Sequence, residues 1–303
     1  MYNYNVPGGI SKGNYVRSPG REEADRTVGL FTAHTGTLPS ATFWEGGSLV
    51  RVQRWRNDRD VQRGGGKRGK IKGFSRQSRR RMMKMVARMD RDQVPVFMTL
   101  TFPDELHELA KFPDEKGRIG KQYCRRFEKR LLRRWPGASA VCRIEWSARK
   151  SGKYIGEIFP HIHCLVWNRG GLEIYGQLLS WCNDSWWACC GKMSDAHRRA
   201  GVQVRMVYNW RGVFSYLSKY TAKVENYEFE VGRLWWCWNI SELPWVRPVL
   251  IRLKEKEAVQ LIRIMRRFAR IRGYDRKSLS VFCDARQWLK KLGPDLVSGP
   301  IVM

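Results

Sequence analysis

The sequence predicts an α+β protein with a central, largely antiparallel β-sheet and helices on one face of that sheet. Three observations lead to this expectation. Hydrophobic residues make up 43% of the 303 residues, enough for a substantial core. Segments with helical periodicity alternate with short β-branched and aromatic segments between residues 75 and 271. Two strand-like segments are joined by a stretch suited to a hairpin, which makes that part of the sheet antiparallel.

The predicted elements follow one another from residue 75 onward. Ser75 caps a helix with methionines on one side and arginines on the other, and Pro103 ends the strand that follows. Next come a basic helix, two strands, an aromatic-rich helix, an alternating strand, another helix, a strand and a long basic helix. The predicted helices cover 75–89, 119–135, 171–190, 211–223 and 253–271, and the predicted strands cover 94–103, 140–148, 161–167, 202–208 and 232–240.

Composition divides the chain into three parts. Residues 1–73 are rich in Gly, Ser and Arg, with one apolar island near 42–52, and we expect a basic, partly disordered N-terminal extension there. Residues 74–245 hold the α+β domain, and residues 246–303 form a basic C-terminal helical region. Gly64, Gly69 and Lys70 fit the start of a phosphate-binding loop. Because Ile71 stands where Ser or Thr would be needed, we expect no nucleotide cofactor.

The charge balance points to a polyanionic partner. The chain has 57 Lys and Arg against 28 Asp and Glu, a formal net charge of +29. So basic a chain repels itself unless it meets a polyanion, and nucleic acid is the first candidate. The basic residues are spread along the chain rather than gathered on one amphipathic helix, which disfavours a membrane surface as the partner. No apolar run is long enough to span a bilayer and no signal-peptide pattern opens the chain, so we expect a cytoplasmic protein.

Two histidines lie two residues apart in the strand-like run PHIHCLVW. Side chains alternate across a strand, so His161 and His163 project from the same face, about 7 Å apart. Glu145, in the preceding strand, can lie beside them if the intervening residues turn a hairpin, and Glu157 in the connecting loop is the alternative. Two imidazoles and a carboxylate leave open positions on a divalent ion, which suits polarising a phosphate oxygen. A pair of hydrogen-bonded core histidines is the structural alternative.

The segment GVFSYLSKYTAK places two tyrosines on one side of a predicted helix. Tyr216 and Tyr220 are four residues apart, and Lys219 and Lys223 each follow a tyrosine by three. A phenol with a pKa near 10 is a weak nucleophile at neutral pH and needs a nearby metal or cation. The lysines are suited to that role or to binding phosphates. A helix with buried tyrosines and solvated lysines is the structural alternative.

Together these motifs resemble the HUH endonuclease superfamily, in particular rolling-circle replication initiators of small single-stranded DNA phages and plasmids. The first family motif is matched by PVFMTLTFP, the second by PHIHCLVW and the third by YLSKYTAK, in the family's order and over residues 74–238. The basic helix FSRQSRRRM before the first motif is also similar to what phage-type members carry. The stretch before the histidines is longer than is common in the family.

The resemblance implies a fold and a reaction. The fold is a ferredoxin- or RRM-like antiparallel sheet. The reaction is site-specific nicking and rejoining of single-stranded origin DNA through a 5′-phosphotyrosine intermediate. Magnesium or manganese (Mg2+ or Mn2+) is the implied cofactor, and the implied location is the cytoplasm of a bacterial host. Since no helicase domain follows, a host helicase and polymerase are the expected partners.

The resemblance also implies roles for individual residues. The implied catalytic residues are Tyr216, Tyr220, Lys219 and Lys223. The implied metal ligands are His161, His163 and Glu145. The expected DNA-binding residues are Arg79, Arg80, Arg81, Lys223, Arg263, Arg266 and Arg267.

Other functions use part of the same pattern. A single-strand DNA transposase of the same superfamily would use the same residues for a different biological purpose. A non-catalytic nucleic-acid-binding protein would have structural histidines and form no covalent product. A metal-dependent phosphodiesterase that activates water would use the histidines and leave the paired tyrosines unexplained.

Overall fold

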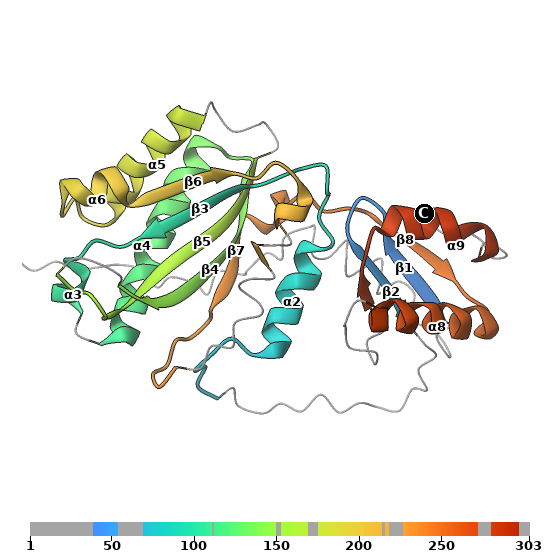
Figure 1. The fold of residues 1–303 in the computed structure, drawn as a ribbon. Coiled ribbons are helices and arrows are strands. Elements are labelled where there is room, and N and C mark those ends of the chain that lie inside the picture. Colours follow the sequence, from blue (N-terminus) through green and yellow to red (C-terminus); the bar gives the residue numbers. More distant parts are fainter. Residues whose placement is uncertain are drawn as a thin grey trace, which may run out of the picture.

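Two antiparallel sheets form the framework of the computed structural model (Figure 1). The structure describes residues 39–53, 69–110, 112–149, 153–168, 175–213, 216–217, 227–271 and 280–296. The larger sheet has the strand order β6-β3-β5-β4-β7 and the smaller one β8-β1-β2-β9. Every strand pair is antiparallel, which confirms the α+β class and the antiparallel central sheet.

The five-stranded sheet is made from the segments that the sequence predicts as strands. Its strands are β3 (Val96–Thr101), β4 (Ala138–Ala148), β5 (Ile158–Asn168), β6 (Val202–Met206) and β7 (Trp235–Trp238). Helix α4 (Pro113–Arg134) connects β3 to β4, and α5 (Tyr175–Cys189) with α6 (Asp195–Ala200) connects β5 to β6. Taken in chain order, the first four strands lie in the sheet as fourth, first, third, second, the connectivity of the ferredoxin-like β-α-β-β-α-β motif.

Helices α4 and α5 cover one face of this sheet. Phe127 of α4 lies 5.7 Å, ring centre to ring centre, from Trp186 of α5 and 6.1 Å from Trp238 of β7. The same face of the sheet contributes fully buried residues such as Ile162 and Cys164. Helix α4 begins earlier than predicted, at Pro113, because proline favours the first turn of a helix and the Glu115 side chain accepts a hydrogen bond from the preceding backbone.

Helix α2 (Arg76–Val86) lies against the opposite face (Figure 1). Ser75 caps it as predicted, because its hydroxyl oxygen accepts a hydrogen bond of 3.2 Å from the Ser78 amide. Met82 and Val86 are its buried residues, and Met82 reaches the sheet beside Val141 of β4. The expectation of helices on one face therefore holds for α4 and α5, while α2 packs on the other.

The four-stranded sheet differs from the predicted division of the chain. Its strands are β1 (Ser40–Trp44), β2 (Leu49–Gln53), β8 (Pro248–Arg252) and β9 (Ser280–Phe282), so residues from the expected extension (1–73) pair with residues from the expected helical region (246–303). Helix α8 (Glu255–Ile271) packs one face of this sheet through residues such as Leu261 and Met265, and α9 (Ala285–Leu296) follows β9. The apolar island at 42–52 is thus a hairpin that completes a second core.

Short contacts link the four-stranded sheet and α9 to the end of α2 and the segment after it. The amide of Ser48, in the β1–β2 turn, donates a 2.7 Å hydrogen bond to the carbonyl oxygen of Ala87 at the end of α2. Gly47 permits this approach, since a Cβ there would lie 2.6 Å from the same oxygen. Arg91 forms a 2.8 Å salt bridge with Asp284 at the start of α9. No helix among the described residues combines the length and apolar composition needed to cross a membrane.

Phe43→Ala tests whether the N-terminal hairpin and α8 share one core. Phe43 is fully buried in that core, so we expect the free energy of unfolding to fall by about 3–5 kcal/mol. Hydrogen exchange should show lost protection across Glu255–Ile271. Thr42→Ala, on the opposite face of the same strand, is the control and should change protection little; equal protection of α8 in both variants would contradict the shared core.

Candidate active site

The register of the five-stranded sheet places His161 between two polar side chains. In an antiparallel sheet directly opposed residues point to the same face. Thr101 of β3 is opposite His161 on one side, and Glu145 of β4 is opposite it on the other. The sequence prediction that Glu145 lies beside the histidines is therefore realised through the β4–β5 pairing.

His163 occupies the next row of the same face. Thr99 of β3 and Arg143 of β4 are directly opposite it. The Thr99 hydroxyl lies 3.1 Å from Nδ1 of His163, and a carboxylate oxygen of Glu145 lies 3.2 Å from Nε2. A carboxylate can only accept, so in the neutral imidazole Nε2 carries the hydrogen and Nδ1 accepts from the hydroxyl. These two contacts fix the orientation of the ring.

His161 is held neutral at physiological pH. Burial, with smaller contributions from the neighbouring His163 and Arg149, lowers the pKa of its imidazole to about 4, and Glu145 acts in the other direction. Within the described residues the imidazole of His161 makes no hydrogen bond. A neutral imidazole keeps a lone pair on one nitrogen, which is the form that binds a metal ion or accepts a proton.

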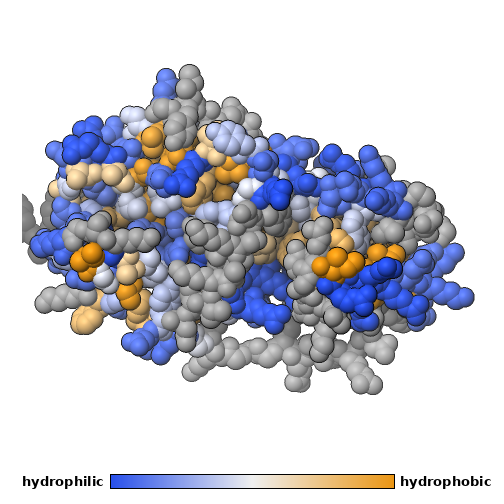
Figure 2. Space-filling model, in the orientation of Figure 1, coloured by the Kyte–Doolittle hydropathy of each residue, from blue (hydrophilic) through white to orange (hydrophobic). Residues whose placement is uncertain are grey.

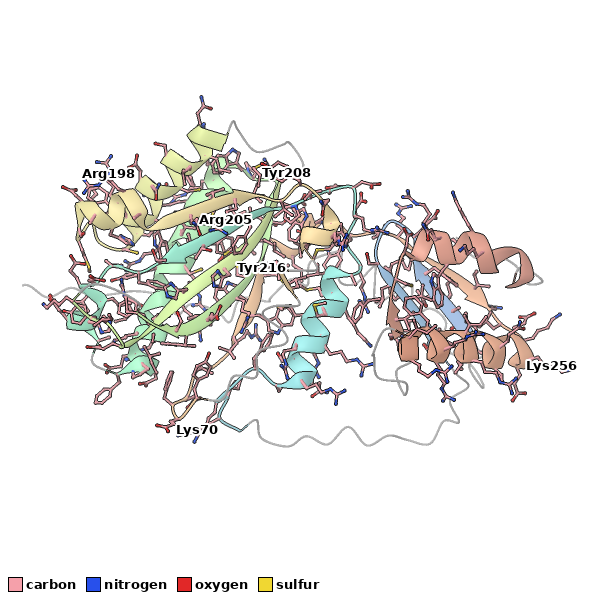
Figure 3. The ribbon with its side chains drawn as sticks, in the orientation of Figure 1. Lys70, Arg198, Arg205, Tyr208, Tyr216 and Lys256 are labelled. Atoms are coloured by element: carbon pink, nitrogen blue, oxygen red, sulfur yellow. The ribbon has the colours of Figure 1, made fainter. Side chains whose placement is uncertain are left out.

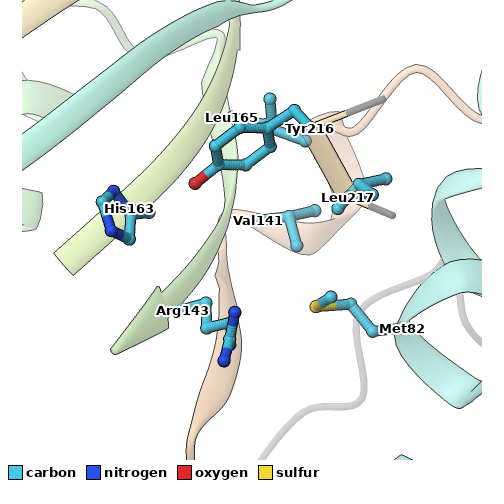
Figure 4. Close-up of a pocket in the computed structure, with 7 residues that line it drawn as sticks. All are labelled: Met82, Val141, Arg143, His163, Leu165, Tyr216 and Leu217. Atoms are coloured by element: carbon cyan, nitrogen blue, oxygen red, sulfur yellow. The ribbon is translucent and has the colours of Figure 1, made fainter. Parts of the chain in front are cut away.

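Tyr216 lies over this face of the sheet (Figure 3). Residues 210–213 and 216–217 are helical, in agreement with the predicted helix 211–223. The Tyr216 ring is 4.1 Å from the Phe97 ring and 6.2 Å from the imidazole of His163, centre to centre, with the latter pair nearly perpendicular. In Figure 4 its hydroxyl points to the His163 side of a small pocket. The tyrosine and the histidine strand, predicted separately, therefore meet.

Arg143 places a buried positive charge at the same pocket. Its side chain is only 4% exposed, and its guanidinium lies 4.8 Å from the centre of the Phe74 ring. Strand alternation puts it on the face of Glu145 and His163, and Figure 4 shows it beneath the Tyr216 hydroxyl. A buried guanidinium is suited to holding a phosphate or a phenolate oxygen. The pocket is lined by Met82, Val141, Arg143, His163, Leu165, Tyr216 and Leu217.

The two candidate carboxylates have different surroundings. Glu157 lies 2.6 Å from Nδ1 of His107 and 3.7 Å from Nζ of Lys116, and both partners are almost fully buried. Burial lowers the pKa of the His107 imidazole, Lys116 lowers it further, and Glu157 acts in the other direction. Glu157 thus belongs to a separate cluster, and Glu145 is the carboxylate that contacts the histidine strand.

The other predicted site residues fall into three groups. Arg79 is half-buried and Arg80 and Arg81 are exposed on α2, while Arg263, Arg266 and Arg267 are exposed on α8. The first group is on α2, which packs on the five-stranded sheet, and the second is on α8, which packs on the four-stranded sheet. The structure therefore does not bring the two groups of arginines together at one site. The remaining predicted residues, Lys219, Tyr220 and Lys223, lie outside the described residues.

The donors suit a divalent ion in type, although they are not arranged around one. In the part of the chain that the structure describes, no three His, Cys, Asp or Glu side chains take up a metal-binding arrangement. Glu145 instead contacts Nε2 of His163. The neutral imidazole of His161, which has no hydrogen bond among the described residues, and the carboxylate directly opposite it nevertheless give nitrogen and oxygen donors at adjacent positions, which fits magnesium or manganese.

Sequence reasoning missed two residues of this site. Arg143 lies two positions before the predicted Glu145 in β4, and Thr99 is directly opposite the predicted His163 in β3, so both are on the face of the predicted residues. The sequence signal that could have found them is a polar residue at an alternating position, which puts it on the same face of the sheet as the predicted residues. An arginine in a basic chain has many exposed roles, so its burial needed the structure.

Comparison of this chain with protein-family models, with curated proteins and with solved structures found no match. The interpretation of the site therefore depends on the geometry described above.

The pKa of His161 makes stability depend on pH in the metal-free protein. An ordinary unfolded histidine titrates near 6.5, so below that pH the unfolded chain binds a proton that folded His161 takes up only near pH 4. The stabilisation is complete above pH 6.5 and is lost as the pH falls towards 4, by of order 3 kcal/mol. Urea titrations with a chelator present should show this loss, and His161→Gln should reduce it. NMR should place the His161 pKa near 4; a value near 6.5 would contradict the buried site.

Proposed function

We propose that this protein is a rolling-circle replication initiator that nicks and rejoins single-stranded origin DNA through a phosphotyrosine intermediate. The observation that carries the proposal is that Tyr216, His163 and Arg143 line one pocket, with His161 and Glu145 in the next row of the same sheet face. A nucleophile, a buried cation and metal-type donors within one site fit phosphodiester transfer better than a structural role.

The chain's own residues account for positioning in this reaction. Arg143 binds a non-bridging oxygen of the scissile phosphate and offsets the charge that develops there. Phe97 and His163 hold the Tyr216 ring from two sides, so that its oxygen faces the pocket. Thr99 and Glu145 keep the His163 ring oriented through its two nitrogens.

The transfer step balances without a high-energy cofactor. The Tyr216 oxygen forms a bond to phosphorus as the bond from phosphorus to the 3′ oxygen breaks. The proton lost by the phenol offsets the proton gained by the released 3′-hydroxyl, which then primes synthesis. The phosphotyrosine keeps the phosphodiester energy, so a later 3′-hydroxyl rejoins the strand by the reverse step. Magnesium or manganese held by His161, His163 and Glu145 would polarise the phosphate, and its binding would replace the contact between Glu145 and Nε2 of His163.

The remaining parts of the proposal rest on the sequence. Tyr220 serves as the second nucleophile, four residues from Tyr216, and Lys219 and Lys223 bind phosphate or favour phenolate. The protein acts in the cytoplasm of a bacterial host, on the DNA of a phage or plasmid, with the host's helicase and polymerase.

The decisive experiment identifies the nucleophile. The protein is incubated with manganese and a pool of random single-stranded oligonucleotides, digested with nuclease and trypsin, and analysed by mass spectrometry. We expect a nucleotide adduct on Tyr216 or Tyr220, and none in the double variant Tyr216→Phe, Tyr220→Phe. Tyr208→Phe is the control, because Tyr208 is 89% exposed and outside the pocket. An adduct that survives in the double variant would falsify the assignment. A complete absence of adducts would favour a non-catalytic binding protein.

Arg143→Met tests the role of the buried cation. Removing one preorganised charge from a transferring phosphate should slow adduct formation by about 100-fold or more, with little change in DNA affinity. Arg205→Gln is the matched control: Arg205 lies on the same face, opposite Phe97, and is exposed, so its loss should weaken binding and leave the rate constant near that of the wild type. Thermal melting checks that both variants are folded. A rate within a few-fold of wild type for Arg143→Met would argue against a catalytic arginine.

A further inference from the structure

The sheet face that carries the candidate active site continues beyond β3 onto β6. Gln203 and Arg205 of β6 are directly opposite Thr99 and Phe97 of β3, and directly opposed residues of an antiparallel sheet point to the same face. The Thr99 hydroxyl contacts the histidine strand β5, and the Phe97 ring packs against Tyr216. Gln203 and Arg205 therefore belong to the face on which the candidate nucleophile lies.

The β6 side of the candidate site is open. β6 is the last strand of its sheet, and the side chains of Gln203 and Arg205 are exposed. On the opposite side of the site Arg143 is buried, and Met82 of α2 lines the pocket. Figure 3 shows Arg205 on the side of Tyr216 that lies away from α2, and Figure 2 shows hydrophilic side chains beside hydrophobic ones at the position of β6. Of the described parts of the site, the β6 side is therefore the one that a ligand can reach without displacing a helix.

An exposed aromatic ring follows the end of β6. Tyr208 lies two residues after Met206, the last residue of the strand, and is 89% exposed, so its ring contributes little to the core. An exposed ring can stack on an unpaired base, a glutamine amide can donate to and accept from a base edge, and a guanidinium binds phosphate. Gln203, Arg205 and Tyr208, which we call the β6 strip, thus combine the groups that bind single-stranded nucleic acid.

We propose that the β6 strip binds the nucleotides next to the scissile phosphate, so that a single DNA strand crosses the sheet between β6 and Tyr216. Neighbouring strands of a sheet lie about 4.8 Å apart, so β6 is roughly 10 Å from β5, a distance that a short run of nucleotides can span. The net charge of +29 favours a polyanion on this surface. Duplex DNA fits less well, because its paired bases cannot stack on Tyr208. Describing the phosphate as scissile rests on the proposed function, whereas binding of a single strand at β6 does not.

The first test determines which face of β6 the DNA touches. A photoreactive p-benzoylphenylalanine replaces Gln203 in one variant and Met206 in another, both in the Tyr216→Phe, Tyr220→Phe background, so that binding is measured without attack on the DNA. Met206 is the matched control, because it lies in the same strand and is 47% exposed but points to the opposite face. The probe is a labelled oligo-dT strand, cross-linked by ultraviolet light.

The expected result is a cross-link to oligo-dT from position 203 in several-fold excess over position 206. Equal yields from the two positions, or a higher yield from position 206, would overturn the proposal. Cross-links to a second copy of the protein in place of DNA would also overturn it, because they would show that the exposed edge of β6 pairs with another protein strand.

The second test measures what the cation and the ring contribute to oligo-dT affinity. Arg205→Gln should lower the slope of log K against log salt by about 0.7, the contribution of one phosphate contact to a single strand. The matched control Arg199→Gln removes an exposed arginine of α6 and should leave the slope unchanged. Tyr208→Ala should weaken binding by about 5-fold or more, whereas Tyr208→Phe keeps the ring and should bind as the parent does. Equal slopes for the two arginine variants, or equal affinities for the two Tyr208 variants, would contradict the assignment.

The background without tyrosine nucleophiles keeps this proposal separate from the nicking reaction. A failure of nicking leaves the binding results intact. Conversely, adducts on Tyr216 or Tyr220 together with no effect at β6 would support nicking and overturn the β6 strip. Since the side chains of the strip are exposed, its variants should melt within a few degrees of the parent. A large fall in melting temperature would show that the side chain is structural and would overturn its assignment as a DNA contact.

Discussion

The candidate site depends on the register of β5 between its two neighbours. Ile162, Cys164 and Val166 point into the core beneath α4 and α5, so β5 cannot slip by one residue without burying both histidines and exposing these apolar side chains. The burial of the apolar residues on one side of β5 thus determines that the histidines lie on the other side of the sheet. Thr99 and Glu145 reach His163 only because their own strands are held in the matching register.

Helix α2 has two different sides, and each serves a different neighbour. Its apolar side packs on the sheet face that carries Tyr216 and His163, while its cationic side meets the second sheet at Arg51. The two sheets are therefore coupled through one helix and the turn after it, where Ser48 bonds to Ala87.

Local sequence patterns predicted much of the candidate site. They did not predict which segments that are distant in the sequence pair or pack together. The shared face of His161 and His163 is a consequence of strand alternation, and the approach of Glu145 follows from a hairpin. The position of Tyr216 against Phe97 depends on the path of the chain between β6 and β7. That path cannot be predicted from the periodicity of the sequence. The hairpin at 40–53 was predicted as part of an extension, because its partner β8 begins about two hundred residues later. The burial of Arg143 likewise depends on Phe74, which comes from a distant segment.

The pairing of β1 with β8 has a consequence for synthesis of the chain. Ser40 leaves the ribosome long before Arg252, its partner in the sheet, and at ordinary translation rates the delay is roughly 10–40 s. During that interval the β1–β2 hairpin has two unpaired edges, while β3 to β7 can already assemble from contiguous chain. Exposed strand edges favour association between nascent chains. The four-stranded sheet is therefore completed last. A chain that stopped before β8 would keep a β1–β2 hairpin with unpaired edges that favour association with other chains.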